Sequence, residues 1–217
     1  PNTFDSFPPK SSLAPSSLKG GTAGHEEVLM SMKAQIWNGS RHGDDRADSI
    51  STLMTETLTA RGYEARHFRM RELKIKPCIG CSRCYTTKPG ECGAKDDTHS
   101  FIPEIPQQDL VVMVTPLMFG GFTSTLKRAI DRCNPMATAF VVREPDATHF
   151  VGRYDSMPKL IFVGLNEQED SQGPNIFRIL SERASRSLQS SSYDHVVFTN
   201  DDDDHAVTQG LNQALGQ

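Results

Sequence analysis

The sequence has 217 residues, a formal net charge of −4 at pH 7, and 36% hydrophobic residues. This length suits one domain with a substantial core. Because the chain has no broad basic excess, nucleic acid and anionic membrane surfaces are not expected as partners, and no apolar run reaches transmembrane length.

The chain contains five cysteines, four of which lie within residues 78–92. Such crowding is poorly suited to disulfides that link distant parts of a fold, and is more typical of metal or redox chemistry. We therefore expect a reducing, cytoplasmic environment.

Residues 1–27 are rich in Pro, Ser, Gly and Lys and show no sustained hydrophobic period. We interpret them as a poorly ordered N-terminal arm or a remnant of expression, the alternative being an arm that packs on a partner subunit. No apolar segment follows Lys10 or Lys19, so a secretory signal is not expected. Residues 28–217 are expected to form the folded domain.

The first part of this domain predicts two strands and a helix. Val28–Trp37 is the first strand candidate, and it ends at Asn38-Gly39-Ser40. After the polar loop Arg41–Asp48, apolar residues at helical spacing indicate a helix that Gly62 closes. Tyr63–Met70 is expected to be an edge strand because it is rich in polar residues.

The next predicted elements surround the most apolar stretch of the chain. Asp96 or Asp97 is expected to cap a short helix that runs through Ile105. Leu110–Val114 is uniformly apolar without a helical period, which is typical of a strand buried on both faces. A loop with two glycines then leads into a helical pattern over Thr123–Cys133.

The last third begins with Pro135–Pro158, which we expect to be an irregular excursion that makes a subunit contact or serves function. Two further strands and two further helices are then predicted: strands Lys159–Gly164 and His195–Thr199, a helix opened by Pro174, and a helix over Ala206–Leu215. The acidic run Asp201–Asp204 is interpreted as a helix N-terminus and solvated surface.

Strands thus alternate with helices five times, which predicts an α/β fold with a five-stranded parallel sheet and helices on both faces. The expected strand order is 2-1-3-4-5, whose switch point lies between strands 1 and 3. Those strands end at Gly39 and Thr115, so their loops are expected to face one crevice.

The loop at Asn38–Ser49 joins a strand to a helix N-terminus, where backbone N–H groups, the helix dipole and hydroxyls favour an anion. It is neither a GxGxxG nor a Walker loop, so a monophosphate is favoured over a dinucleotide or a triphosphate. A surface turn that merely caps the helix is the alternative.

The second loop, Thr115–Gly121, offers backbone amides and an apolar wall of Leu117, Met118 and Phe119. This surface suits a planar heterocycle, whereas a buried turn beneath the following helix is the alternative. Taken together, the loops predict a ligand with a phosphate at one end and a flat ring at the other, a description that FMN fits.

Several stretches resemble the flavodoxin-like NAD(P)H-dependent FMN reductase and iron-sulfur flavoprotein family: Asn38–Ser40, Lys76–Cys84, Asp96-Asp97, Thr115–Arg132 and Arg153–Leu160. The resemblance implies that Ser40, Arg41 and Ser49 hold the FMN phosphate. It further implies that the isoalloxazine ring is held by Thr115, Pro116, Leu117, Met118, Phe119 and Gly120. The first loop is longer than is usual for the family and carries Asp44 and Asp45 in place of neutral or basic residues.

The cysteine loop has the spacing Cys78-x2-Cys81-x2-Cys84-x7-Cys92. Three thiolates this close together resemble those that hold a [4Fe–4S] cluster, and iron-sulfur flavoproteins have a fourth cysteine a few residues on. The alternatives are zinc and a metal-free loop of reduced thiols. Cys133 is expected to be a core residue.

The resemblance implies an FMN-dependent oxidoreductase that transfers electrons from NAD(P)H to a small-molecule or protein acceptor. The alternative is an electron carrier with FMN and [4Fe–4S] that a ferredoxin-like partner reduces. A homodimer or homotetramer is implied, and no catalytic acid, base or nucleophile is assigned.

Overall fold

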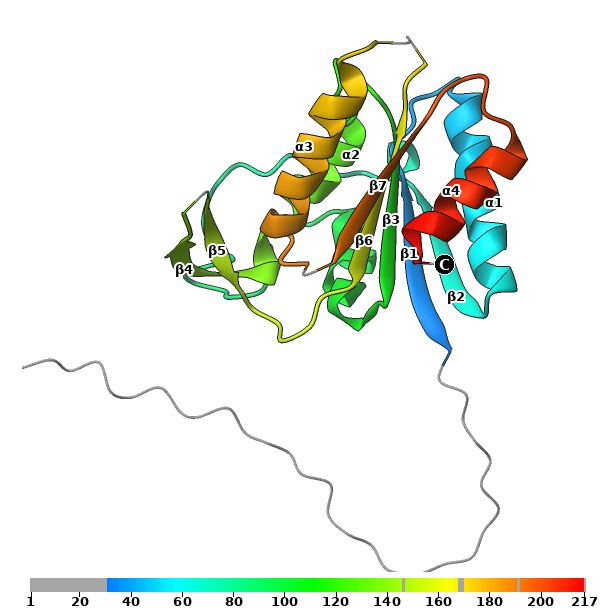
Figure 1. Cartoon of the computed structure of the whole chain (residues 1–217). Helices are drawn as coiled ribbons and strands as arrows, with labels where there is room; N and C mark the ends of the chain where they lie inside the picture. The colour runs from blue at the N-terminus through cyan, green and yellow to red at the C-terminus, as the bar shows by residue number, and fades with distance from the viewer. Residues whose placement is uncertain (1–30, 146, 168–169, 191, 217) are drawn as a thin grey trace, which may run out of the picture. The chain divides into compact units, whose positions relative to one another are not determined.

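A computed structural model describes residues 31–145, 147–167, 170–190 and 192–216. The predicted arm at residues 1–27 and the first residues of the predicted strand at Val28 lie outside this described part. Five strands form a parallel sheet in the order β2-β1-β3-β6-β7 (Figure 1). Their bounds are β1 Met32–Asn38, β2 Tyr63–Arg69, β3 Leu110–Pro116, β6 Lys159–Leu165 and β7 Tyr193–Phe198.

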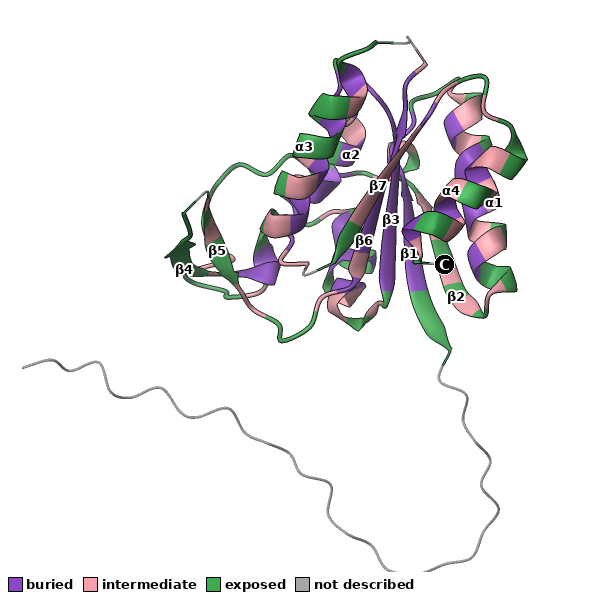
Figure 2. Cartoon of the chain, in the orientation of Figure 1, coloured by how far each residue is buried: buried purple, intermediate pink, exposed green. Residues whose placement is uncertain are grey.

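In the part of the chain that the structure describes, four α-helices cover the two faces of the sheet. Figures 1 and 2 show α1 (Asp45–Ala60) and α4 (Asp204–Ala214) on one side, with α2 (Ser124–Asp131) and α3 (Gly173–Ser187) on the other. Every residue of β3 is buried, as its uninterrupted apolar run predicts. Alternate β3 side chains enter different cores, because successive residues of a strand point to opposite faces.

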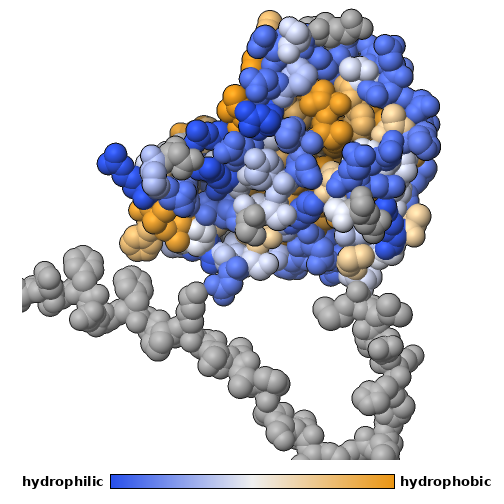
Figure 3. All heavy atoms as spheres, viewed as in Figure 1, coloured by the Kyte–Doolittle hydropathy of each residue, from blue (hydrophilic) through white to orange (hydrophobic). Residues whose placement is uncertain are grey.

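The expected strand order 2-1-3-4-5 is not matched exactly, because the sequence contains two further strands between β3 and β6, which are neighbours in the parallel sheet. β4 (Ala137–Arg143) and β5 (Thr148–Gly152) pair antiparallel as a separate sheet. The expectation that Pro135–Pro158 is irregular was therefore wrong. Apolar side chains are exposed on this hairpin, and Figure 3 shows them gathered there.

The short helix predicted through Ile105 is instead a pair of 3₁₀ helices, η2 (Asp97–Ser100) and η3 (Ile102–Gln107). Asp96 is the N-cap, as predicted, and its carboxylate accepts a hydrogen bond from the Thr98 N–H. Pro103 and Pro106 lack N–H donors, which is why a continuous α-helix does not form here. Two other 3₁₀ turns, η1 (Met70–Glu72) and η4 (Asn134–Met136), complete the described elements.

The two loops of the predicted crevice meet at the carboxyl end of the sheet. The Gly39 N–H donates to the Val114 carbonyl at 2.8 Å, and the Thr123 hydroxyl donates to the Gly39 carbonyl at 2.6 Å. Thr123 also caps α2, since its hydroxyl oxygen accepts from the Leu126 N–H. Within the described part of the chain, no helix is both long and apolar enough to cross a membrane.

Gly39 is required by close packing, because a Cβ there would lie 2.6 Å from Leu126 Cβ and 3.1 Å from Thr123 Oγ1. We expect Gly39→Ala to lower the free energy of unfolding by about 1–3 kcal/mol through overpacking. Urea denaturation measures this change. The matched control is Gly121→Ala, whose Cβ would meet nothing closer than 3.4 Å. Equal stabilities of the two variants would contradict the packing argument.

Candidate functional site

The loop after β3 is a tight turn built on two left-handed residues. Met118 and Gly121 exchange backbone hydrogen bonds of 2.9 Å in both directions. Phe119 and Gly120 have φ of 51° and 76°, as a type I′ turn requires. Gly120 has no space for a side chain because a Cβ would lie 2.6 Å from Ile176 Cβ at the start of α3.

Phe119 has a conformation that costs most L-residues energy, and its side chain is 91% exposed. The two hydrogen bonds of the turn hold the Phe119 backbone in this conformation, but packing within the protein does not account for its exposed phenyl ring. Strain of this kind is concentrated at functional sites, so Phe119 is the strongest ligand-contact candidate in this loop.

The other predicted ring contacts differ in how far they are open to a ligand. Thr115, Pro116, Leu117 and Gly120 are buried, whereas Met118 is half-buried. The Thr115 hydroxyl is already engaged, accepting from the Thr123 N–H and donating to the Pro116 carbonyl. Met118 and Phe119 thus supply the accessible side-chain surface, and the buried residues shape the turn beneath them.

The loop after β1 is organised around the carboxylate of Asp48, in the first turn of α1. Its Oδ1 accepts from Asn38 Nδ2 at 2.6 Å and from Ser40 Oγ at 3.0 Å. Arg71, just beyond β2, donates to both carboxylate oxygens at 2.7 and 2.6 Å, and also to the Ser40 hydroxyl. These hydrogen bonds, foremost those from Arg71, hold the pKa of the Asp48 carboxyl well below its ordinary value despite burial.

Of the three residues predicted to hold phosphate, only Ser40 lies at this centre. Arg41 and Ser49 are exposed, and the Ser49 hydroxyl donates to the Asp45 carbonyl within α1. Sequence reasoning missed both Asp48 and Arg71. The available signal was that β2 neighbours β1 in the expected order, so residues after β2 reach the same loop.

These two loops differ in how well they fit FMN. The turn with Met118 and Phe119 provides a flat apolar surface suited to the ring. The anion position after β1 is filled by Asp48, a negative group where a phosphate would be expected. The ring half fits, therefore, and the phosphate half does not fit in this arrangement.

The four cysteines of the cysteine loop lie around one small cavity. Cys78, Cys81, Cys84 and Cys92 line a single small cavity together with Arg132 and Asn134. All are free thiols, and burial raises the pKa of Cys84, with the neighbouring Cys92 adding to this effect. Among the described residues, no three His, Cys, Asp or Glu side chains are arranged to hold a metal ion. The [4Fe–4S] cluster thus stays a prediction, whereas the prediction that Cys133 is a core residue is confirmed by its burial.

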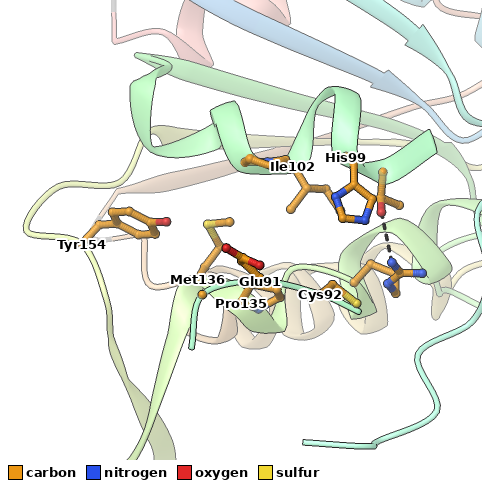
Figure 4. Close-up of a pocket in the computed structure, with 11 residues that line it drawn as sticks. Glu91, Cys92, His99, Ile102, Pro135, Met136 and Tyr154 are labelled. Atoms are coloured by element: carbon orange, nitrogen blue, oxygen red, sulfur yellow. Dashed lines mark hydrogen bonds between the residues drawn. The ribbon is translucent and has the colours of Figure 1, made fainter. Parts of the chain in front are cut away.

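A second cavity of about 170 Å³ adjoins the cysteine cavity and shares Cys92, Arg132 and Pro135 with it. Figure 4 shows Tyr154 at one end of this cavity, and Cys92 and His99 toward the other. The sequence patterns did not predict it, because its lining comes from η2, η3, η4 and the segment after β5.

A buried ion pair holds the cysteine loop against the end of α2. Arg132 Nη1 lies 2.6 Å from Asp96 Oδ2, and both side chains are 1% exposed. Asp96 also accepts from the Lys76 N–H, and Arg132 donates to the Lys76 carbonyl. Burial raises the pKa of Asp96, but hydrogen bonds from Thr98, Arg132 and Lys76 outweigh it and bring the pKa to about 2.

Comparisons with known proteins agree with this architecture. The model of the NADPH-dependent FMN reductase family matches residues 32–153. The chain belongs to this family. Its fold is flavodoxin-like, as predicted.

Relatives and solved structures extend the comparison. An iron-sulfur flavoprotein of Methanocaldococcus jannaschii is 30% identical over 105 residues, which cover 46% of this chain and 53% of that protein. One from Archaeoglobus fulgidus is 35% identical over 100 residues, or 45% of this chain and 50% of that protein. The chain spans about half the length of these relatives.

Among solved structures, an NAD(P)H:quinone oxidoreductase from Methanothermobacter marburgensis has a TM-score of 0.56 at 17% identity, covering 85% of this chain and 92% of that one. A putative quinone reductase from Klebsiella pneumoniae has a TM-score of 0.58 at 14% identity, covering 86% of each chain. At these identities the likeness concerns the fold alone.

Asp96→Asn is expected to lower the free energy of unfolding at pH 7 by about 3–5 kcal/mol, because it leaves the Arg132 charge buried and unpaired. Thermal or urea denaturation measures the loss. Asp97→Asn is the control, since Asp97 is an exposed neighbour whose carboxylate accepts from the Lys74 N–H. Similar losses in both variants would contradict a special role for the buried pair.

The same carboxylate predicts a pH dependence. Because its folded pKa of about 2 lies below the ordinary 3.8, ionised Asp96 contributes fully above about pH 4. That contribution, about 2 kcal/mol, is lost as the pH falls toward 2. The wild-type free energy of unfolding should therefore decline more steeply than that of Asp96→Asn between pH 4 and 2.

The strain at Phe119 predicts that Phe119→Gly is more stable than Phe119→Ala by about 0.5–1 kcal/mol, although both remove the ring. Glycine avoids the left-handed penalty and loses part of that gain to its greater unfolded-state entropy. Chemical denaturation measures the difference in the free energy of unfolding between the two variants. A more stable alanine variant would show that the turn is not strained at this residue.

Proposed function

We propose that this chain is an FMN-dependent oxidoreductase that transfers electrons from NAD(P)H to a small-molecule or protein acceptor. The observation that carries this proposal is the exposed Phe119 on a strained turn at the carboxyl end of the central strand. Open α/β sheets bind ligands at that point, and membership of the NADPH-dependent FMN reductase family supports a flavin there.

The side chains and backbone of the turn would hold the ring. Met118 and Phe119 offer an apolar surface, and no described residue accepts a hydrogen bond from the N–H of Phe119 or of Gly120. Those two N–H groups would be donors to the polar edge of a heterocycle. A bound flavin supplies the electron transfer, while the chain supplies binding, orientation and exclusion of water.

The rigidity of this surface comes from residues that do not touch the ligand. Thr123, the N-cap of α2, donates to the carbonyl of Gly39 after β1. The Leu117 N–H donates to the carbonyl of Leu165, the last residue of β6. The turn is thus fixed to both neighbouring strands before a ligand arrives. No side chain is assigned as an acid, base or nucleophile.

A second candidate function is an electron carrier that contains FMN and a [4Fe–4S] cluster and is reduced by a ferredoxin-like partner. It is favoured by the four cysteines that line one cavity, and by the iron-sulfur flavoproteins among the relatives. Cys78, Cys81, Cys84 and Cys92 would be the ligands, and metal binding would replace their thiol protons.

Assembly into a homodimer or homotetramer is proposed as well. The β4–β5 hairpin exposes Phe140 (68%) and Val141 (55%), and a two-stranded sheet gains little stability alone. The cysteine loop contacts this hairpin through a Tyr85–Phe150 ring stack with centroids 5.1 Å apart. A cytoplasmic location would keep the five thiols reduced.

The visible spectrum of anaerobically purified protein tests both candidates. The reductase is expected to show flavin absorption alone, bleached by NAD(P)H, without bound iron. The carrier is expected to show additional iron–sulfur absorption and about four irons per chain. Protein that is colourless and fails to take up added FMN would contradict both.

The contribution of the turn is tested by Phe119→Ala, which we expect to weaken FMN binding by about three- to tenfold through loss of aromatic stacking. Fluorescence titration measures the affinity. Phe140→Ala is the matched control, because it removes an exposed phenyl ring from the hairpin instead. Equal FMN affinities in the two variants would show that Phe119 does not contribute to flavin binding.

A further inference from the structure

The anion position of the loop after β1 is filled by a side chain of the protein itself. The Asp48 carboxylate accepts hydrogen bonds from Asn38, Ser40 and Arg71. With the Arg71 guanidinium it forms a bidentate ion pair. The exposed fractions of the Asp48 and Arg71 side chains are 28% and 13%. Such bidentate pairs are geometrically specific, and this one is largely shielded from water.

Two backbone donors of the loop are also engaged. The Ser40 N–H donates to Asn38 Oδ1 at 2.8 Å, and the Arg41 N–H donates to Asp44 Oδ2 at 3.1 Å. A ligand phosphate would have to displace the Asn38 amide oxygen and the Asp44 carboxylate to obtain these two hydrogen bonds. The loop therefore has the shape of an anion site, but side chains of the protein itself already accept from these donors.

The charge around this loop also opposes a phosphate. Asp44 and Asp45 flank the start of α1, and Glu167 follows β6 at the same edge of the sheet. Burial and the Asp44 charge raise the pKa of Glu167, while the Arg41 charge lowers it. A phosphate would add roughly −1.5 to −2 charge to a region already crowded with carboxylates.

We propose that Asp48 is a specificity-determining residue that makes flavin binding independent of the 5′-phosphate, so that riboflavin binds as tightly as FMN. This inference rests on the proposed flavin-binding function. Affinity would come from the ring surface of Met118 and Phe119, and Arg71 would serve to keep Asp48 ionised and in place. The chemical class of ligand is an isoalloxazine with or without a terminal phosphate.

The test is a titration of the flavin-free full chain with FMN and with riboflavin, followed by flavin fluorescence. For the wild type, we expect dissociation constants that agree within about threefold. In Asp48→Asn, which removes the competing charge and frees Arg71, FMN is expected to bind at least about tenfold more tightly, because like charges in contact oppose association strongly. Riboflavin binding should stay within about twofold of the wild type, since it carries no charge to be repelled.

Asp45→Asn is the matched control. It removes an equal charge from the same helical turn, but from an exposed residue whose repulsion of a phosphate is screened by water and salt. It should therefore change the FMN affinity by less than about threefold and leave riboflavin binding unchanged. A wild type that prefers FMN over riboflavin by more than about thirtyfold would overturn the proposal, and this arm needs no variant to fold. An unchanged FMN-to-riboflavin ratio in a folded Asp48→Asn protein would overturn it as well. Failure of the wild type to bind either flavin would instead overturn the proposed function and this inference with it.

Discussion

The hydrogen bond from the Thr123 hydroxyl to the Gly39 carbonyl is the contact on which the candidate site depends. It joins the loops that leave the two central strands, and the same residue caps α2. The glycine is necessary because any side chain there would overlap Leu126. One close approach therefore fixes the spacing between the turn that carries Phe119 and the loop that carries Asp48.

Helix α2 connects this edge of the sheet to the cysteine cavity. It begins beside the Phe119 turn and ends at Asp131, immediately before Arg132 and its ion pair with Asp96. Eight helical residues span about 12 Å, so the ring surface and the thiols lie at opposite ends of one short, rigid element. The two chemical features of the chain are thus connected by one helix, although they share no side chain.

Hydrophobic patterns along the sequence predicted those helices and strands well that are buried on one face or on all sides. The run Leu110–Val114 has no polar interruption, and β3 is buried at every position. The β4–β5 hairpin was missed because its apolar residues are exposed at successive positions, so no alternation marks them as a strand. The helix expected through Ile105 failed for a local reason as well, namely its two prolines.

The sequence indicated where the candidate site lies in the fold, but only some of the residues that form it. Motif spacing indicated the turn with Phe119 and the loop with Ser40, because both follow strands of the expected switch point. The Asp48–Arg71 pair joins residues 23 positions apart across β2, and no pattern along the chain specifies that Arg71 reaches back to α1. Long-range pairing of this kind depends on side-chain reach, which strand order alone does not determine.

The left-handed backbone at Phe119 has a consequence for how this position tolerates change. Most residues other than glycine have a similar conformational cost there, so exchanging one of them for another changes the free energy of unfolding little. The exposed side chain also has no core packing to lose. Substitutions at residue 119 would therefore change ligand affinity more than they change folding stability. In a library that is randomised at this one position, differences in ligand binding would reflect the side chain's contact with the ligand and not the loss of folded protein.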